Sequence, residues 1–487
     1  MIQNLQKAKL SEFLKSSTWT VLILDDTTFP IINALFRFTE LRRLNITTIF
    51  RLENTRENVT ASAIYFVHSK NLHSIVSDVI ARTYSSYNLN FIDCVSRDGL
   101  EMLAGTLSER RLALKVESVW DRHLNFLALD NNVFVVGGGV HEMAAGLFSL
   151  FFNLDNEPFI VSGDENVSGD KNVSGDESVA ELLYKKMRNN LVRKKDRRPL
   201  LILFRRENDV ITPLEHNWTY AGLINDVLSL NINTVKYTKD DRPCTYTITP
   251  DDTFYATNKY EKFPVVTERI EKEHLNYKKE IGKKNYDIAE LNRSNEMIDA
   301  HMSICLNLIN EISDRGYDEY YEMEQRNASD DQIYKMVEKG TVEDVKRFVC
   351  TLLRKGARPE VIEYIMAKRG ITQQFVEHVV QRIKIEENTL LKRATNILSK
   401  IINVDTSTPL SVYVGEIVAK ARKGELRVMG GRKVYYEEVA GVYVFVVGGG
   451  CYKEIDSLRR MDRDIVYGCG EILDGRRALE RIESGMK

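Results

Sequence analysis

Two glycine triplets that follow apolar runs are the first candidates for chemistry in this sequence. Gly137-Gly138-Gly139 follows the run VFVV at 133–136, and Gly448-Gly449-Gly450 follows the same letters at 444–447. A glycine-rich turn between a strand and a helix can hold a phosphate with its backbone N–H groups. Neither triplet continues as G-x-G-x-x-G, and no G-x-x-x-x-G-K-[ST] occurs. The triplets favour tight strand–helix turns, with nucleotide or sugar binding as the alternative.

The other patterns that could support catalysis are incomplete. His141-Glu142 begins a string like H-E-x-x-H, but Ala145 stands where the second zinc ligand would be. Asp25-Asp26 follows an apolar run and favours a strand-end turn over a metal site. No residues supply a nucleophile, a base and an oxyanion hole together. We therefore predict no catalytic residue, no metal site, no cofactor and no enzymatic activity.

The most distinctive stretch is PLLILFRRENDVITPLEHNWTYAGLINDVLSL at 199–230. A buried strand is expected first, followed by charged residues that end in Asp209. Thr212-Pro213-Leu214 comes next, where the proline suits a turn or the first position of a helix. A helical pattern that holds Trp218 and Tyr220 completes it. On its own, this pattern indicates one more strand–helix unit.

Alternating strands and helices are predicted to position these residues. Apolar runs at 21–26, 63–67 and 89–95 read as buried strands, with helical stretches at 39–44 and 72–84 between them. This alternation predicts a mostly parallel sheet. Further strands are expected at 133–138, 158–163 and 200–204. The tandem repeat VSGDEN, VSGDKN, VSGDES at 161–178 favours a solvated loop.

Helical periodicity dominates from about 264 to 403. One apolar stripe steps at helical spacing through Leu291, Ile298, Met302, Cys305, Ile309 and Ile312. A long helix is predicted over 373–402. Strands return at 442–447 and 464–468, and the first of these needs a partner from before the helical block. We infer a discontinuous α/β domain interrupted by a helical insertion.

Composition narrows the class of protein. The 487 residues carry 68 Lys+Arg and 70 Asp+Glu, a net charge of −2, which excludes a chain-wide basic field for nucleic acid. The N-terminus does not resemble a secretory signal, and no apolar run reaches the roughly 18 residues of a membrane span. We expect a cytoplasmic protein.

The stretch at 199–230 resembles the signature of the SM family (Sec/Munc proteins), which bind SNAREs and regulate vesicle fusion. The H-x-W-T-Y form is most similar to the Sly branch, which acts between endoplasmic reticulum and Golgi. Segments 84–136 and 254–325 resemble that branch as well. The matching signature positions, expected to be structural, are Arg206, Asp209, Pro213, His216, Trp218, Thr219, Tyr220 and Asp226.

The resemblance implies a three-domain arch with α/β domains 1 and 2 and a mainly helical domain 3. The corresponding boundaries are 1–131 for domain 1, 132–238 with 406–487 for domain 2, and 239–405 for domain 3. After Glu324 the sequence leads within a few residues into the next predicted helix and leaves little room for a long lid loop. The family's lid-type autoinhibition is therefore not expected here.

The resemblance also implies two binding sites. Domain 1 would hold the N-terminal peptide of a syntaxin, with Leu100, Leu103 and Ala104 on one helix face and Val116 and Val119 on the next helical stretch. The alternative is that these residues belong to the core. The predicted pocket comprises Leu100, Leu103, Ala104, Leu107, Val116 and Val119. The predicted SNARE groove lies on the hairpin at 292–324 and includes Arg293, Glu296, Asp299 and Arg315.

The resemblance implies a regulator that binds a syntaxin-type SNARE and templates or protects the SNARE bundle in ER-to-Golgi and intra-Golgi transport. We expect a monomer that reaches ER and Golgi membranes peripherally through SNAREs, without nucleic acid or a small-molecule substrate. The alternatives are an SM protein of the endosome, vacuole or exocytosis, a scaffold subunit, and an α/β enzyme that uses the glycine triplets.

Overall fold

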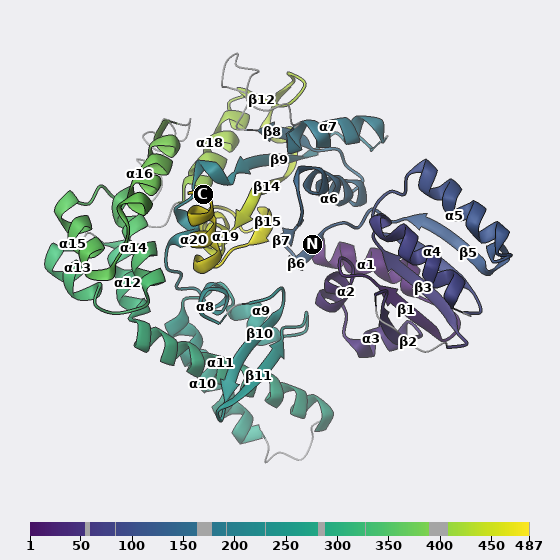
Figure 1. Cartoon of the computed structure of the whole chain (residues 1–487), viewed down its shortest axis with the longest axis horizontal. Helices are drawn as coiled ribbons and strands as arrows, with labels where there is room; N and C mark the ends of the chain where they lie inside the picture. The colour runs from purple at the N-terminus through teal and green to yellow at the C-terminus, as the bar shows by residue number, and fades with distance from the viewer. Residues whose placement is uncertain are drawn as a thin grey trace. The chain divides into compact units, whose positions relative to one another are not determined.

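The computed structural model describes residues 1–53, 59–82, 84–162, 178–190, 192–228, 230–280, 288–326, 328–388 and 408–486 (Figure 1). The chain forms two compact units. The first holds Met1–Leu203, Arg427–Phe445 and Val466–Gly470, and the second holds Phe204–Leu426, Val446–Ile465 and Glu471–Lys487. The first unit is thus built from three separate stretches of chain. The three domain boundaries implied by the resemblance stay predictions.

The first unit begins with a parallel five-stranded sheet in the order β2-β1-β3-β4-β5. Helices α4 and α5 cover one face, where their apolar side chains form a core with the inner strands. The parallel sheet predicted from the alternating pattern is confirmed. Its strands are β1 (Thr20–Leu24), β2 (Ile46–Arg51), β3 (Ser62–Val67), β4 (Tyr87–Phe91) and β5 (Val116–Asp121). Its helices are α1 (Ile2–Leu14), α2 (Phe29–Leu35), α3 (Phe38–Arg43), α4 (Leu72–Ala81) and α5 (Arg97–Glu109).

The strand-end turn predicted at Asp25-Asp26 is present. The buried Asp25 carboxylate accepts hydrogen bonds from the backbone of Thr27 and Thr28 and from the backbone of His68. This carboxylate joins the end of β1 to the segment that follows β3.

A second, six-stranded sheet in the order β6-β7-β15-β14-β9-β8 also belongs largely to the first unit. It is mixed, because β6 and β7 are antiparallel whereas β7–β15 and β8–β9 are parallel. β14 lies between β15 and β9, so the partner expected from before the helical block is confirmed. The elements are β6 (Leu127–Asp130), β7 (Val133–Val135), α6 (Val140–Asn153), β8 (Phe159–Ser162), α7 (Val179–Asn189), β9 (Arg198–Arg205), β12 (Leu426–Arg427), β13 (Lys433–Val434), β14 (Val439–Gly450) and β15 (Val466–Ile472).

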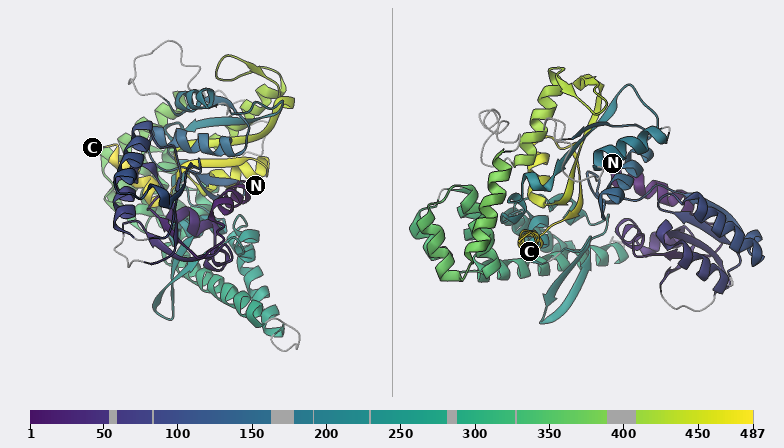
Figure 2. Two further views of the ribbon diagram at one scale, coloured as in Figure 1. Left: turned by 90° about the vertical axis from the view of Figure 1, so that its right-hand side faces the viewer. Right: turned by 45° about the horizontal axis from the view of Figure 1, so that its top comes forward.

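The second unit is mainly helical, as the periodicity of the middle of the chain predicted. Figure 2 shows α10 and α11 as a long hairpin, with the β10–β11 ribbon beside α11. Its elements are α8 (Tyr220–Val227), β10 (Thr234–Lys239), β11 (Arg242–Thr247), α9 (Thr253–Asn258), α10 (Phe263–Glu280), α11 (Ile288–Arg315), α12 (Tyr317–Gln325), α13 (Asp330–Met336), α14 (Val342–Arg354), α15 (Pro359–Arg369), α16 (Gln373–Asn388), α18 (Pro409–Arg422), α19 (Tyr452–Met461) and α20 (Gly475–Ser484).

The apolar stripe predicted on α11 is largely confirmed. Ile298, Cys305 and Ile312 are buried in one core, but Ile309 is 44% exposed. The side chain of Leu291, the long helix beyond Asn388 and most of the 161–178 repeat lie outside the described residues. None of the described helices is long and apolar enough to cross a membrane.

Candidate functional site

The signature begins with a buried charge cluster where β9 ends. Arg206 donates hydrogen bonds to the backbone oxygen of Gly449 at 3.1 Å and to Glu454 at 2.6 Å. A second carboxylate, that of Asp209, is fully buried, and its Oδ2 lies 3.7 Å from the Arg206 guanidinium. Burial opposes the charge of Arg206, but the two acids outweigh that effect and raise its pKa. Pro213 is buried in the short 3-10 turn that follows.

His216 lies at the centre of a second buried cluster. Its ring Nδ1 is 2.7 Å from Glu324 Oε1, and its backbone N–H donates to Glu324 Oε2 at 2.7 Å. The ring stacks on Tyr320 with centroids 5.1 Å apart, and Nε2 is 3.8 Å from Asp344. Burial alone would lower the pKa of His216, but the Glu324 and Asp344 carboxylates together outweigh it, so the pKa is raised. This histidine connects the signature to α12 and α14.

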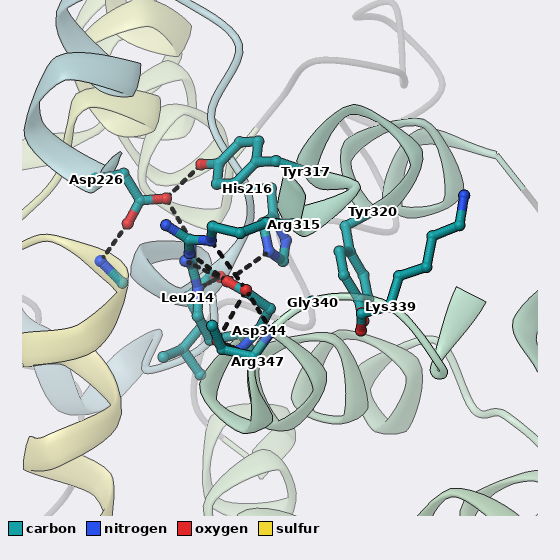
Figure 3. Close-up of polar contacts among 12 residues, drawn as sticks. Leu214, His216, Asp226, Arg315, Tyr317, Tyr320, Lys339, Gly340, Asp344 and Arg347 are labelled. Carbon is teal, nitrogen blue, oxygen red and sulfur yellow. Dashed lines mark hydrogen bonds and ion pairs between the residues drawn. The ribbon is translucent and has the colours of Figure 1, made fainter. Parts of the chain in front are cut away.

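Asp226 extends the cluster to the C-terminal helix (Figure 3). It accepts hydrogen bonds from Arg347 at 2.7 Å, from the hydroxyl of Tyr317, and from the backbone N–H of Gly475 at 2.7 Å. Arg347 also donates to the backbone oxygen of Leu214 at 2.8 Å. Burial raises the pKa of Asp226. Arg347 and Tyr317 together with the other nearby groups lower it by more, so the net pKa is lowered. One carboxylate thereby joins α8, α12, α14 and α20.

Arg315 belongs to this network and not to an exposed groove. Its guanidinium pairs with both oxygens of Asp344, and its side chain is 19% exposed. The prediction that Arg315 presents a charge to a SNARE is therefore wrong for this residue, because Asp344 already engages that charge. Burial raises the pKa of Asp344, but the nearby His216 ring and the hydrogen-bonded Arg315 guanidinium lower it to a net value well below the ordinary one.

The remaining signature residues pack into the adjacent core. Trp218 stacks on Tyr321 with centroids 5.4 Å apart. The hydroxyl of Tyr220 lies 2.8 Å from His301 Nδ1, and His301 Nε2 lies 2.9 Å from Asp252. Thr219 is buried as well. These groups resemble an acid–base relay in type, but all three members of the relay are buried among aromatic rings.

The polar side chains of the signature thus have partners inside the fold, and their structural role stays a prediction. The sequence did not identify the partners of its polar residues, namely Tyr317, Glu324, Asp344 and Arg347. Glu324 lies 108 positions after His216, and Arg347 lies 121 positions after Asp226. The available signal was the chemistry of the signature: buried charges need opposite charges. That rule predicts partners but does not identify them.

The predicted peptide pocket is divided between surface and core. Leu100 is 41% exposed and Ala104 is exposed, whereas Leu103 and Leu107 are buried in the core beneath α5. Val119 is 38% exposed.

The expectation of a helix at Val116 and Val119 is wrong, since both lie on β5. β5 is the edge strand of its sheet and pairs with β4, with a shift in register after the first pair. Val116 is half-buried against the core below α5. Leu89 of β4 pairs with Val119 and belongs to that core. Val119 therefore lies on the sheet face that α5 covers.

The predicted groove residues lie on α11. Glu296 is exposed, and Asp299 is exposed and pairs with Lys239 of β10. Leu306 is also exposed on this helix, at 54%. The side chain of Arg293 lies outside the described residues.

Glutamates occupy the helix ends that a phosphate would need at the glycine triplets. At the start of α6, the Glu142 carboxylate accepts from the Gly139 N–H at 3.0 Å. At the start of α19, Glu454 accepts from the Cys451 N–H at 3.3 Å. An anion would meet these carboxylates, which disfavours the nucleotide alternative. Among the described residues, no three His, Cys, Asp or Glu side chains gather as a metal site would require.

Comparisons with known proteins identify the family of this chain. Residues 20–481 match the model of the Sec1 family. The chain is 32% identical to the SEC1 family transport protein SLY1 of Encephalitozoon cuniculi, with 100% of this chain and 99% of that protein covered. It is 25% identical to the SLY1 protein of Oryza sativa, over 97% and 92%.

Two solved structures share the fold. Sly1p in complex with an N-terminal peptide of Sed5p matches with a TM-score of 0.84 at 20% identity, over 100% of this chain and 98% of that one. The SM protein Vps45 in complex with the Qa SNARE Tlg2 matches with a TM-score of 0.81 at 16% identity, again over 100% and 98%. The α/β class with a helical insertion is confirmed, and the chain belongs to the Sec1 (SM) family.

Proposed function

We propose that this protein is an SM regulator of SNARE assembly in vesicle docking and fusion, acting in ER-to-Golgi and intra-Golgi transport. The observation that carries the proposal is the match to SLY1 transport proteins along almost the whole length of both chains. The buried signature supports the proposal, because hydrogen bonds of Asp226 join the helical insertion, through α12 and α14, to the C-terminal helix α20. We assign no catalytic step to the protein.

The surface of α5 and β5 is the proposed site for the N-terminal peptide of a syntaxin. Leu100 and Ala104 are one helical turn apart and exposed, and Val119 is exposed on the adjacent edge strand. The buried Leu103 and Leu107 form the floor beneath them. An apolar side chain of a short peptide would bury area against this surface, at roughly 25 cal/mol per Å². The relative Sly1p was solved with such a peptide, from Sed5p.

The face of α11 is the proposed contact for a SNARE helix. It combines the acids Glu296 and Asp299 with the exposed apolar residues Leu306 and Ile309. SNARE helices are amphipathic and of mixed charge, so this combination is complementary to them. Holding such helices in register would lower the conformational entropy cost of nucleating the bundle. The cytoplasmic, membrane-peripheral location follows from the same proposal.

Calorimetry with the intact protein tests the peptide site. The probes are the N-terminal peptides of the syntaxin-type SNAREs from the same organism. We expect one peptide to bind, and Leu100→Asp to weaken it at least tenfold. The matched control is Ile385→Asp, which changes another exposed apolar residue, 51% exposed on α16. Absence of binding by every peptide, or equal weakening by both variants, would overturn the assignment.

A further inference from the structure

A dense run of cations surrounds the end of α7 in the first unit. From Lys185 to Arg198 the sequence holds eight Lys or Arg residues and one acid, although the whole chain has a net charge of −2. Arg188, Arg193, Lys194 and Lys195 are all exposed. A local positive field is therefore present in a protein that has no positive charge overall.

The turn between β12 and β13 adds further cations to this surface. The hydroxyl of Tyr184 lies so close to Gly430 that a Cβ there would be 2.8 Å from it. Arg188 lies over the Tyr184 ring, 5.8 Å from its centroid. Gly430 and Gly431 both have positive φ, at 85° and 78°, which forms the turn that exposes Arg432.

Phe159 links the two cationic segments directly. The guanidinium of Arg198 lies 4.3 Å from the ring centroid, and that of Arg432 lies 5.2 Å from it. Arg197 donates a hydrogen bond to the backbone oxygen of Val439, at the start of β14, at 2.7 Å. Figure 1 shows α7, β8 and β12 near one another. We call this surface the basic band: Lys185, Lys186, Arg188, Arg193, Lys194, Lys195, Arg427, Arg432 and Lys433.

Nearby acids neutralise only part of the basic band. Arg193 is 3.5 Å from Asp155, and Lys194 is 3.3 Å from Glu157. Arg432 pairs with Glu438. These cations remain 54–70% exposed, and such exposed pairs are weak and screened by salt. Lys195 also lies 3.9 Å from Asp155, so the nine cations of the band face three acids in these pairs: Asp155, Glu157 and Glu438.

We infer that the basic band binds the anionic headgroups of a phospholipid membrane directly, without a SNARE. All of its members except Lys186 are exposed, and they come from helix α7, an irregular segment and the stretch that spans β12 and β13. A bilayer leaflet presents many anionic groups across a plane and so engages cations from all three, whereas one acidic peptide offers a single row. Tyr435, two residues after Lys433 and 53% exposed, is an amphipathic ring of the kind enriched at the membrane interface.

Vesicle flotation of the full chain alone tests the inference. Vesicles of phosphatidylcholine with about 30% phosphatidylserine are compared with pure phosphatidylcholine, because each Lys or Arg beside an anionic leaflet contributes about fivefold to binding. We expect binding only to the anionic vesicles and its loss as NaCl is raised from about 0.1 to about 0.5 M. In the triple variant Arg188→Glu, Arg193→Glu, Lys433→Glu, binding to the anionic vesicles should fall more than tenfold.

The matched control reverses three exposed lysines outside the band: Lys335→Glu, Lys368→Glu and Lys384→Glu. It changes the net charge equally and should bind nearly as the unmodified chain does. Conversion of Arg188 and Arg193 to lysine should preserve binding, which separates charge from a loss of folding. Equal binding to neutral vesicles, or equal loss in both triple variants, would overturn the inference. Tighter binding to soluble polyglutamate than to the anionic vesicles would overturn it in favour of an acidic protein partner.

Discussion

The buried network of the second unit and the α5–β5 surface of the first use their residues in opposite ways. In the network, His216 and Arg347 are buried and the side chain of Asp226 is only 6% exposed, and each charge is matched by another. On the α5–β5 surface, Leu100 and Val119 remain exposed over a filled core. The distinctive motif therefore maintains the fold, whereas a less distinctive segment presents the proposed binding surface. Sequence distinctiveness and contact with a partner are separate properties in this chain.

Breaking the buried ion pair should give the largest effect on stability. Arg347→Met leaves Asp226 charged and buried without its main partner, and we expect the free energy of unfolding to fall by about 3–5 kcal/mol. Urea denaturation measures it. The double variant Arg347→Met, Asp226→Leu should recover part of the loss, because no unpaired charge remains. A loss below about 1 kcal/mol in the single variant would contradict the structural role of the signature.

Helix α5 alone allows a buried residue, Leu103, to be compared with an exposed one, Leu100. Leu103→Ala removes buried atoms and should cost about 2–4 kcal/mol of stability, whereas Leu100→Ala should cost less than about 0.5 kcal/mol. Peptide binding should show the opposite order, with the larger effect from Leu100→Ala after correction for the unfolded fraction. Parallel denaturation and calorimetry on both variants provide the measurement. Equal stability costs would mean that α5 does not divide into a buried and an exposed face.

Acidification should weaken the network of the second unit specifically. The pKa values of Asp226 and Asp344 are lowered in the folded state, so their stabilisation is present above the ordinary carboxyl pKa and is lost as pH falls. His216 has a raised pKa, so its contribution is full below its ordinary pKa and is lost as pH rises through the raised value.

Denaturation across pH tests the sign assigned to the carboxylates. We expect Asp344→Asn to reduce the stability lost between about pH 6 and pH 3 by about 1–2 kcal/mol relative to the unmodified chain. An unchanged acid profile in this variant would count against the assigned sign.

The smallest effect is expected at the exposed acids of α11. Glu296→Lys should leave stability within about 0.5 kcal/mol and should change the affinity for a SNARE helix only several-fold, because exposed charges are screened. Arg315→Glu should instead destabilise the fold, since Arg315 pairs with the buried Asp344. Circular-dichroism melts and binding titrations distinguish the two.

The parallel arrangement of β1, β3 and β4 was predictable, because apolar runs alternating with helical stretches have few other solutions, whereas β2 and the antiparallel β6 were not predicted. The signature was identified through its resemblance to the SM family, which also implied its structural role, whereas the residue types alone indicated only one more strand–helix unit. The location of Val116 and Val119 was not, because a short edge strand with one half-buried face carries a weak pattern. The inward role of Arg315 depends on Asp344, 29 positions later, and spacing along one helix cannot reveal such a contact.

The most direct test of the division between buried signature and exposed binding surface uses the double variant Leu100→Asp, Val119→Asp. Calorimetry with the syntaxin N-terminal peptide that binds the unmodified protein is paired with a thermal melt. The division predicts at least a tenfold loss of affinity with an unchanged melting temperature. Undiminished binding, or unfolding of the variant, would contradict it.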